Sequence, residues 1–78
     1  MTYEVRIFLK DGLLDPAAVT IERALKRLNF SEIGGLRTGK VFLIETDAKT
    51  SRERVEQMCA QLLANPVMER FEIREVTA

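Results

Sequence analysis

The 78-residue sequence carries few side chains that could activate a nucleophile at neutral pH. It contains no histidine and a single cysteine, Cys59, so neither a Ser-His-Asp nor a Cys-His arrangement can form. The same counts exclude an internal disulfide and the usual Cys and His spacings of zinc sites. The scattered glutamates form no convergent pair of the kind that general acid–base chemistry needs. We therefore predict no catalytic, metal-binding or cofactor-binding residues in this chain.

A glycine turn flanked by two cations is the strongest candidate for ligand binding. It spans Arg37–Lys40, "RTGK", and such a turn could hold a carboxylate or a phosphate group. It lacks, however, the full spacing and the following helix of a P-loop. We favour a solvated turn over a phosphate site, and a contact with a partner protein is the third interpretation.

Two proline dipeptides are predicted to mark helix ends. Asp15-Pro16 begins a helix, because the carboxylate can accept hydrogen bonds from free amides and proline suits the first helical position. A phosphate is disfavoured at this helix start because Asp15 would repel it. Asn65-Pro66 stops the second helix, since proline lacks the amide that a continuing helix needs. On spacing alone, both dipeptides are structural.

Hydrophobic periodicity predicts the elements that position these motifs. A strand over residues 2–10 is followed by a helix from Pro16 to about Leu28, and a second helix starts with a capping box at Thr50 and Glu53. The last strand covers residues 70–76. Cys59 lies in an apolar helical stripe, so we interpret it as a small buried residue rather than a reactive thiol. The residues expected to face inward are Tyr3, Val5, Ile7 and Leu9; Ile21, Ala24, Leu25 and Leu28; Val55, Met58, Cys59, Leu62 and Leu63; and Phe71 and Ile73.

The middle strand is apolar on both faces, because four apolar residues follow one another from Val41 to Ile44. One face can meet the helices of its own chain, whereas the other needs a second copy or a different protein to cover it. The nearby glycines allow either one long kinked strand or a hairpin that turns at Thr38-Gly39. Both alternatives are compatible with the sequence.

The order of elements is strand, helix, strand in one or two parts, helix, strand. This order predicts a single α+β domain over residues 1–78, a two-layer sandwich in which both helices pack on one face of a small sheet. The other face of the sheet is then open for association. A chain of this length buries only about 60% of the surface that its unfolded form exposes, so self-association is expected.

The charge balance argues against two classes of partner. Twelve basic and twelve acidic residues cancel, so no net field attracts a nucleic acid or an anionic membrane. The sequence opens on a strand-like pattern rather than a signal peptide, and no stretch approaches the roughly 20 apolar residues of a membrane span. We therefore expect a cytoplasmic protein that binds neither nucleic acid nor membranes.

Three stretches taken together carry a family resemblance. "LLDP" precedes the first helix, "RTGKVFLIE" forms the middle strand, and "MCAQLLANPVMERFEI" covers the second helix and the last strand. In this order and at this chain length they resemble the PurS family, the small subunit of phosphoribosylformylglycinamidine synthase. The resemblance implies a non-catalytic subunit in de novo purine biosynthesis, which forms homo-oligomers, bridges the glutaminase and synthetase subunits and supports ammonia transfer. It also implies that ATP and magnesium belong to the large subunit.

The resemblance implies that the motifs contact other protein chains. We expect the strand from Arg37 to Thr46 to form much of the self-association surface, and the turn and the Asn65-Pro66 junction to lie near the larger subunits. The candidate contact residues are Arg37, Gly39, Lys40, Phe42, Ile44, Asn65 and Pro66. The alternative is a free-standing dimeric α+β regulatory module that binds a small metabolite at the Gly39-Lys40 turn. An RNA-binding sheet is disfavoured by the zero net charge and the single tyrosine.

Overall fold

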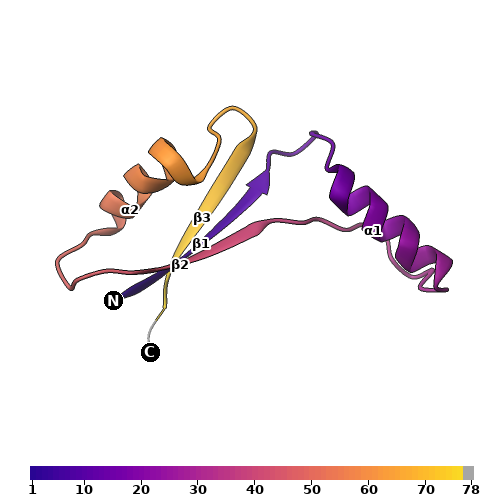
Figure 1. The fold of residues 1–78 in the computed structure, drawn as a ribbon, viewed down its shortest axis with the longest axis horizontal. Helices are drawn as coiled ribbons and strands as arrows, with labels where there is room; N and C mark the ends of the chain where they lie inside the picture. The colour runs from indigo at the N-terminus through magenta and orange to yellow at the C-terminus, as the bar shows by residue number, and fades with distance from the viewer. Residues whose placement is uncertain (77–78) are drawn as a thin grey trace.

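Three antiparallel strands form one sheet in the order β2-β1-β3 (Figure 1). The computed structural model describes residues 1–76. Its elements are β1 (Thr2–Leu9), α1 (Pro16–Arg27), β2 (Lys40–Glu45), α2 (Arg52–Met58) and β3 (Glu69–Val76), and a short π-helix, η1 (Cys59–Leu63), continues α2. The strands and helices follow the predicted order, and the α+β class is confirmed.

The core lies between the inner face of the sheet and α2 with η1. Tyr3, Val5 and Ile7 alternate along β1 and are at most 1% exposed. Val55 and Cys59 cover them from the helical layer and are fully buried. The alternation predicted for the first strand is confirmed at these three residues, because residues two apart share one face of a strand, whereas Leu9 at the strand end is only half-buried. The other members of this cluster, or residues packed against it, are Ala64, Ile73, Phe42, Ile44, Leu63 and Phe71.

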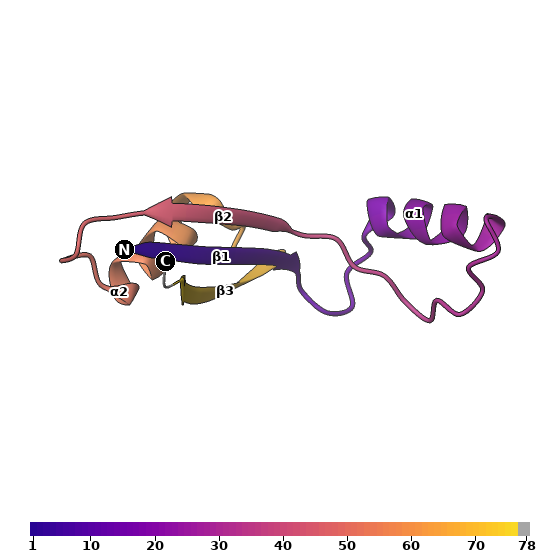
Figure 2. The same cartoon turned by 90° about the horizontal axis from the view of Figure 1, so that it is seen from below.

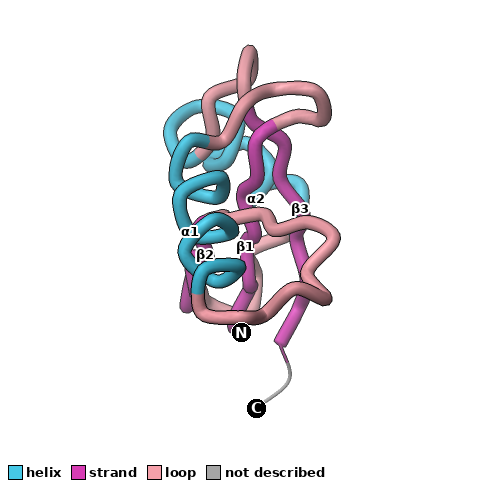
Figure 3. Tube along the Cα trace, turned by 90° about the vertical axis from the view of Figure 1, so that its right-hand side faces the viewer, coloured by secondary structure: helices cyan, strands magenta, loops and turns pink. Residues whose placement is uncertain are grey.

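The first helix does not pack on the sheet, which contradicts the expectation that both helices cover one face. Figures 1 and 2 show α1 projecting beyond the end of the strands, at the tip of a molecule that measures 49 × 31 × 14 Å. Within α1 only Ala18 is buried, while Ile21 and Leu28 of the predicted inward stripe are 44% and 66% exposed. We call α1 and the segment that returns from it, residues 16–39, the arm. Figure 3, viewed from the arm's end, shows the loops that lead to and from this helix.

The width of the sheet explains this difference. Neighbouring strands lie about 4.8 Å apart, so three strands present a face only roughly 10–14 Å wide. One helix with its side chains is about 10–12 Å across. The helical layer formed by α2 and η1 therefore nearly fills the inner face, and little of it is left for α1.

The middle of the chain contains one strand and no hairpin. β2 begins at Lys40, opposite Ile7, and residues 30–39 have no strand structure. The backbone amide of Thr38 donates to the side chain of Asp15 rather than to a neighbouring strand. Neither of the two alternatives, a long kinked strand or a hairpin at Thr38-Gly39, describes this segment.

The second helix begins one residue later than the capping box predicts. Ser51 is the N-cap, and its Oγ accepts a hydrogen bond from the amide of Arg54 at 3.2 Å. The hydroxyl of Thr50 donates instead to Asp47 Oδ1 at 2.8 Å. Because Asp47 already binds this hydroxyl in a turn, Thr50 does not cap the helix.

The end of the second helix is wider than an α-helix. In η1 the amide of Ala64 donates to the carbonyl of Cys59 at 2.9 Å, the i to i+5 spacing of a π-helix. Leu62, predicted to face inward, is 84% exposed. The extra residue in the turn rotates this side chain away from the face that a period of 3.6 assigns to it. The helix still ends before Asn65-Pro66, as expected.

Candidate partner-binding surface

The described side chains do not gather into a reactive cluster. Within residues 1–76 no group of three or more His, Cys, Asp or Glu side chains could hold a metal ion. No helix in that range is both long and apolar enough to cross a bilayer. Burial raises the pKa of the Cys59 thiol, which keeps it protonated and unreactive at neutral pH. What the chain does present to other molecules is a set of turns and exposed apolar residues.

The Asp15-Pro16 and Arg37–Lys40 motifs meet at the start of α1. Asp15 Oδ1 accepts a hydrogen bond from the amide of Ala18 at 3.0 Å, which caps the helix. Asp15 Oδ2 accepts from the Thr38 hydroxyl at 2.7 Å and from the Thr38 amide at 3.3 Å. The Thr38 hydroxyl, followed by the Ala18 amide, lowers the pKa of Asp15. The cap predicted at Asp15 is confirmed, and it has a second role that the sequence did not reveal.

The Arg37–Lys40 turn shows no convergence of positive charge. The Arg37 guanidinium pairs with Asp11 at 3.2 Å, and both side chains are mostly exposed. Lys40 is exposed at the first position of β2. Gly39 lies against β1, where an added Cβ would be 2.7 Å from the carbonyl oxygen of Ile7. The glycine is therefore needed for close packing of two backbone segments.

A cavity of about 270 Å³ lies beside this turn, between the end of β1 and the start of α1. Its charged lining is mixed in sign, with Lys10 and Arg37 opposed by Asp11, Asp15 and Glu22. Such a lining favours neither an anion nor a cation. The apolar part of the lining includes Phe8, Leu13, Leu14, Val19 and Leu36.

The Asn65-Pro66 junction is a tight turn held to the neighbouring loop. Asn65 Oδ1 accepts a hydrogen bond from the amide of Val67 at 3.0 Å, and the Asn65 amide donates to Glu69 Oε1 at 2.8 Å. Lys10 Nζ donates to the carbonyl of Pro66 at 2.8 Å, and the Lys10 amide donates to the carbonyl of Met68. The side chain of Asn65 is thus engaged within its own turn.

Exposed apolar side chains surround these two adjacent loops at one end of the sheet. They come from the turn that follows β1, from the end of η1 and from the segment that joins η1 to β3. The Lys10 hydrogen bonds hold the turn and the joining segment together. We call this surface the end patch, and its members are Leu13 (44% exposed), Leu14 (74%), Leu62 (84%), Val67 (78%) and Met68 (47%). Sequence reasoning missed these residues. The available signal was that Leu13 and Leu14 precede the helix cap and so belong to no helical stripe.

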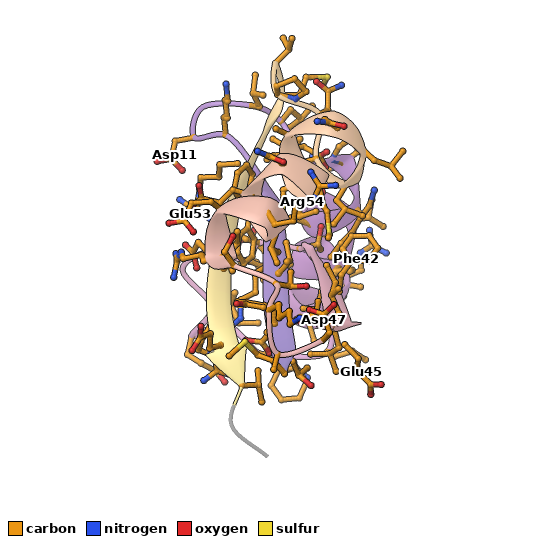
Figure 4. All side chains as sticks on the ribbon, turned by 90° about the vertical axis from the view of Figure 1, so that its left-hand side faces the viewer. Asp11, Phe42, Glu45, Asp47, Glu53 and Arg54 are labelled. Atoms are coloured by element: carbon orange, nitrogen blue, oxygen red, sulfur yellow. The ribbon has the colours of Figure 1, made fainter. Side chains whose placement is uncertain are left out.

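A second exposed apolar surface lies on β2. Phe42 and Ile44, the predicted contact residues, pack against the core of their own chain, whereas Val41 and Leu43 point to the opposite face and are 59% and 66% exposed. We call Val41 and Leu43 the β2 strip. Figure 4 labels Phe42 on the side of the molecule where this strand lies. The strip is therefore the part of the strand that is open to another molecule.

Beside the β2 strip, the outer face of the sheet is charged. Glu4 pairs with Arg74 at 3.0 Å and with Arg6 at 3.2 Å, and its side chain is only 15% exposed. The register places Leu43 directly beside Glu4 and Val41 beside Arg6. An apolar strip next to paired charges resembles the core and rim of a protein interface.

Comparison with known proteins identifies the chain. Residues 2–77 match the family model for PurS, described as phosphoribosylformylglycinamidine (FGAM) synthase. The chain belongs to the PurS family. It is 45% identical over 73 residues to the PurS subunit of Methanothermobacter thermautotrophicus, covering 90% of this chain and 86% of that protein. To the PurS subunit of Archaeoglobus fulgidus it is 37% identical over 76 residues, covering 94% and 95%.

Solved structures agree with this assignment. The crystal structure of Methanocaldococcus jannaschii PurS superposes with a TM-score of 0.85 at 40% identity and covers 94% of this chain and 92% of that one. A chain in the structure of PurLQS from Thermotoga maritima superposes with a TM-score of 0.85 at 31% identity, covering 96% and 95%. This PurS-family chain is a subunit of phosphoribosylformylglycinamidine synthase and acts in purine biosynthesis.

Proposed function

We propose that this chain is a non-catalytic bridge that joins the glutaminase and synthetase subunits of the synthase and supports ammonia transfer between them. The observation that carries the proposal is the amount of apolar surface outside the core: eleven large apolar side chains of residues 1–76 are exposed. A monomer gains nothing from exposing contiguous apolar patches, and such patches mark protein interfaces. A similar chain occurs in PurLQS from Thermotoga maritima, which supports an assembly of this kind.

Bridging serves the reaction because of the chemistry of ammonia. Ammonia released in bulk water diffuses away or is protonated, so two active sites held in one closed complex transfer it more efficiently. The bridge needs no reactive group for this role. In this proposal ATP and magnesium act in the large subunit, and the assembly works in the cytoplasm.

The two apolar surfaces have different partners in this proposal. A second copy of the chain contacts the β2 strip and the apolar side chains of the arm. This copy covers the apolar surface that the three-stranded sheet and its one helical layer leave exposed. The end patch contacts the larger subunits. The Asn65-Pro66 turn, which precedes Val67 and Met68, is hydrogen-bonded to Lys10 in the turn that leads to Leu13 and Leu14.

Two leucine variants separate these contacts. Leu43→Asp places a charge in the β2 strip, and Leu62→Asp places one in the end patch, at positions that are 66% and 84% exposed and so leave the core intact. We expect Leu43→Asp to lower the mass of the free protein in light scattering, and Leu62→Asp to keep that mass but weaken binding to the larger subunits. If both variants behave alike in both assays, the assignment of surfaces is wrong.

Reconstitution of the synthase tests the bridging role itself. Activity is measured with and without this chain, using glutamine or free ammonium as the nitrogen donor. We expect omission of the chain to abolish only the glutamine-dependent activity. Equal glutamine-dependent activity without the chain would refute the proposal.

The second candidate is a dimeric regulatory module that binds a small metabolite in the cavity of about 270 Å³ beside the Arg37–Lys40 turn. That volume is near the lower end of small-molecule sites. A rise in melting temperature with a nucleotide or an amino acid, in a protein that binds neither larger subunit, would favour this candidate. The mixed charge of the lining is the reason that we place it second.

A further inference from the structure

The arm has little packing that could fix its direction relative to the sheet. α1 contributes a single buried residue, Ala18, and makes no extensive contact with any strand or with α2. The chain enters α1 through a turn in which Gly12 is exposed and has a φ of 86°. Glycine is the residue that adopts this conformation most freely. Something other than apolar packing must therefore hold the arm in one orientation.

Asp15 supplies a connection because its two carboxylate oxygens bind different parts of the chain. Oδ1 accepts from the amide of Ala18 in the first turn of α1. Oδ2 accepts from both the hydroxyl and the amide of Thr38, which lies on the segment that enters β2. A carboxylate is planar and rigid, so these bonds fix Thr38 relative to the start of the helix. Hydrogen bonds to a charged acceptor are also stronger than neutral ones.

The other end of this connection is anchored to the sheet. Gly39 follows Thr38 and packs so closely on β1 that an added Cβ would be 2.7 Å from the carbonyl oxygen of Ile7. Lys40 then begins β2 and pairs with Ile7 in the sheet. A continuous path runs from α1 through Asp15, Thr38 and Gly39 to β1, and it bypasses the turn at Gly12.

We propose that the Asp15–Thr38 pair is a latch that holds the arm at a fixed angle to the sheet. The latch explains why the two motifs, 23 residues apart, meet in the fold. Its consequence for assembly rests on the proposed function: an arm held in its bound orientation loses less conformational freedom when a second copy binds it. Asp15 and Thr38 are positioning residues in this account and need not touch the partner.

Threonine variants isolate the latch from the helix cap. Thr38→Val removes the hydroxyl that donates to Asp15 Oδ2, keeps a side chain of similar shape and leaves the Oδ1 cap on Ala18 untouched. Thr38→Ser restores a hydroxyl and is the conservative rescue. The matched control is Thr20→Val, because the Thr20 hydroxyl donates to the carbonyl of Pro16 within the helix at 3.0 Å and plays no part in the latch.

The direct measurement is the distance distribution between spin labels on the arm and on the sheet. Labels are attached at Arg23→Cys in α1 and Glu72→Cys in β3, both exposed positions, while the buried Cys59 is left unlabelled. The labelled protein is mixed with an excess of unlabelled protein, so that the measured distances are those between two labels on the same chain. We expect a narrow distribution for the unsubstituted protein, Thr38→Ser and Thr20→Val, and a broad one for Thr38→Val. Equal widths for Thr38→Val and Thr20→Val would overturn the latch.

Self-association of the same variants tests the consequence. We expect Thr38→Val to bind a second copy about tenfold more weakly, the scale of one lost hydrogen bond to a charged group, with a far-ultraviolet spectrum that shows both helices intact. Thr20→Val should associate normally. A broad distribution with unchanged self-association would overturn the link to assembly. The assay with glutamine and ammonium tests the bridging role separately, so a failure of the latch can be distinguished from a failure of the bridging role.

Discussion

Gly39→Ala is the substitution that most directly tests the close approach between the turn and β1. An added Cβ would lie 2.7 Å from the carbonyl oxygen of Ile7 and 2.8 Å from a ring carbon of Phe8. The Phe8 ring can rotate away, but the Ile7 carbonyl belongs to the central strand of the sheet. Gly39 does not have a positive φ, so its backbone conformation is open to alanine and the expected cost is steric.

The size of the effect follows from two opposing terms. Replacing glycine by alanine at an unstrained position stabilises a protein by about 0.4–1 kcal/mol through the unfolded state. Overpacking a close contact costs about 1–3 kcal/mol. We therefore expect Gly39→Ala to lower the free energy of unfolding by about 1–2 kcal/mol. The matched control is Gly35→Ala, where nothing lies within 4 Å of the added Cβ, and which should be neutral or slightly stabilising.

Thermal and urea unfolding at one protein concentration compare the two variants, because self-association makes the melting temperature depend on concentration. Each 1 kcal/mol corresponds to about 4–8 °C in a domain of this size, so Gly39→Ala should melt roughly 10 °C below Gly35→Ala. If the two variants melt together, Gly39 is not held against Ile7 and the path from the arm to the sheet is not as described.

Three further predictions concern the core and the titrating groups. Val55→Ala should lower the free energy of unfolding by about 2–3 kcal/mol because Val55 is fully buried, whereas Leu62→Ala at an exposed position should change it by less than about 0.5 kcal/mol. The Cys59 thiol should react with iodoacetamide at a measurable rate only in denaturant, since it is buried. The hydrogen bond from the Thr50 hydroxyl lowers the pKa of Asp47. The ionised Asp47 carboxylate therefore stabilises the fold at pH values above the ordinary aspartate pKa of about 4. That contribution, measured against Asp47→Asn in urea titrations, should be lost as pH falls through the lowered pKa.

The features predicted well from the sequence are those fixed by neighbours along the chain. Tyr3, Val5 and Ile7 are buried because strand side chains alternate. The Asp15 cap follows from one residue pair at a helix start. Such signals need no knowledge of the rest of the fold.

The failures share a dependence on distant parts of the structure. Four consecutive apolar residues on β2 do not indicate which alternate pair faces the core. Pairing with β1 decides it, because Phe42 lies opposite Val5 and Leu43 lies opposite Glu4. Leu62 was misplaced because a period of 3.6 does not apply inside η1. The hydrogen bond between Asp15 and Thr38 spans 23 residues, and spacing gave no sign of it.

The Asn65-Pro66 junction sets the direction of the residues that follow it. A contact between Asn65 and a larger subunit stays a prediction. In the fold, Asn65 Oδ1 accepts a hydrogen bond from the amide of Val67. Val67 is 78% exposed beside this turn, and its backbone direction depends on that hydrogen bond. The turn therefore orients apolar side chains of the end patch, and in the bridging proposal these side chains make the contact with a larger subunit. Asn65→Ala should then weaken that contact without removing any atom from the interface.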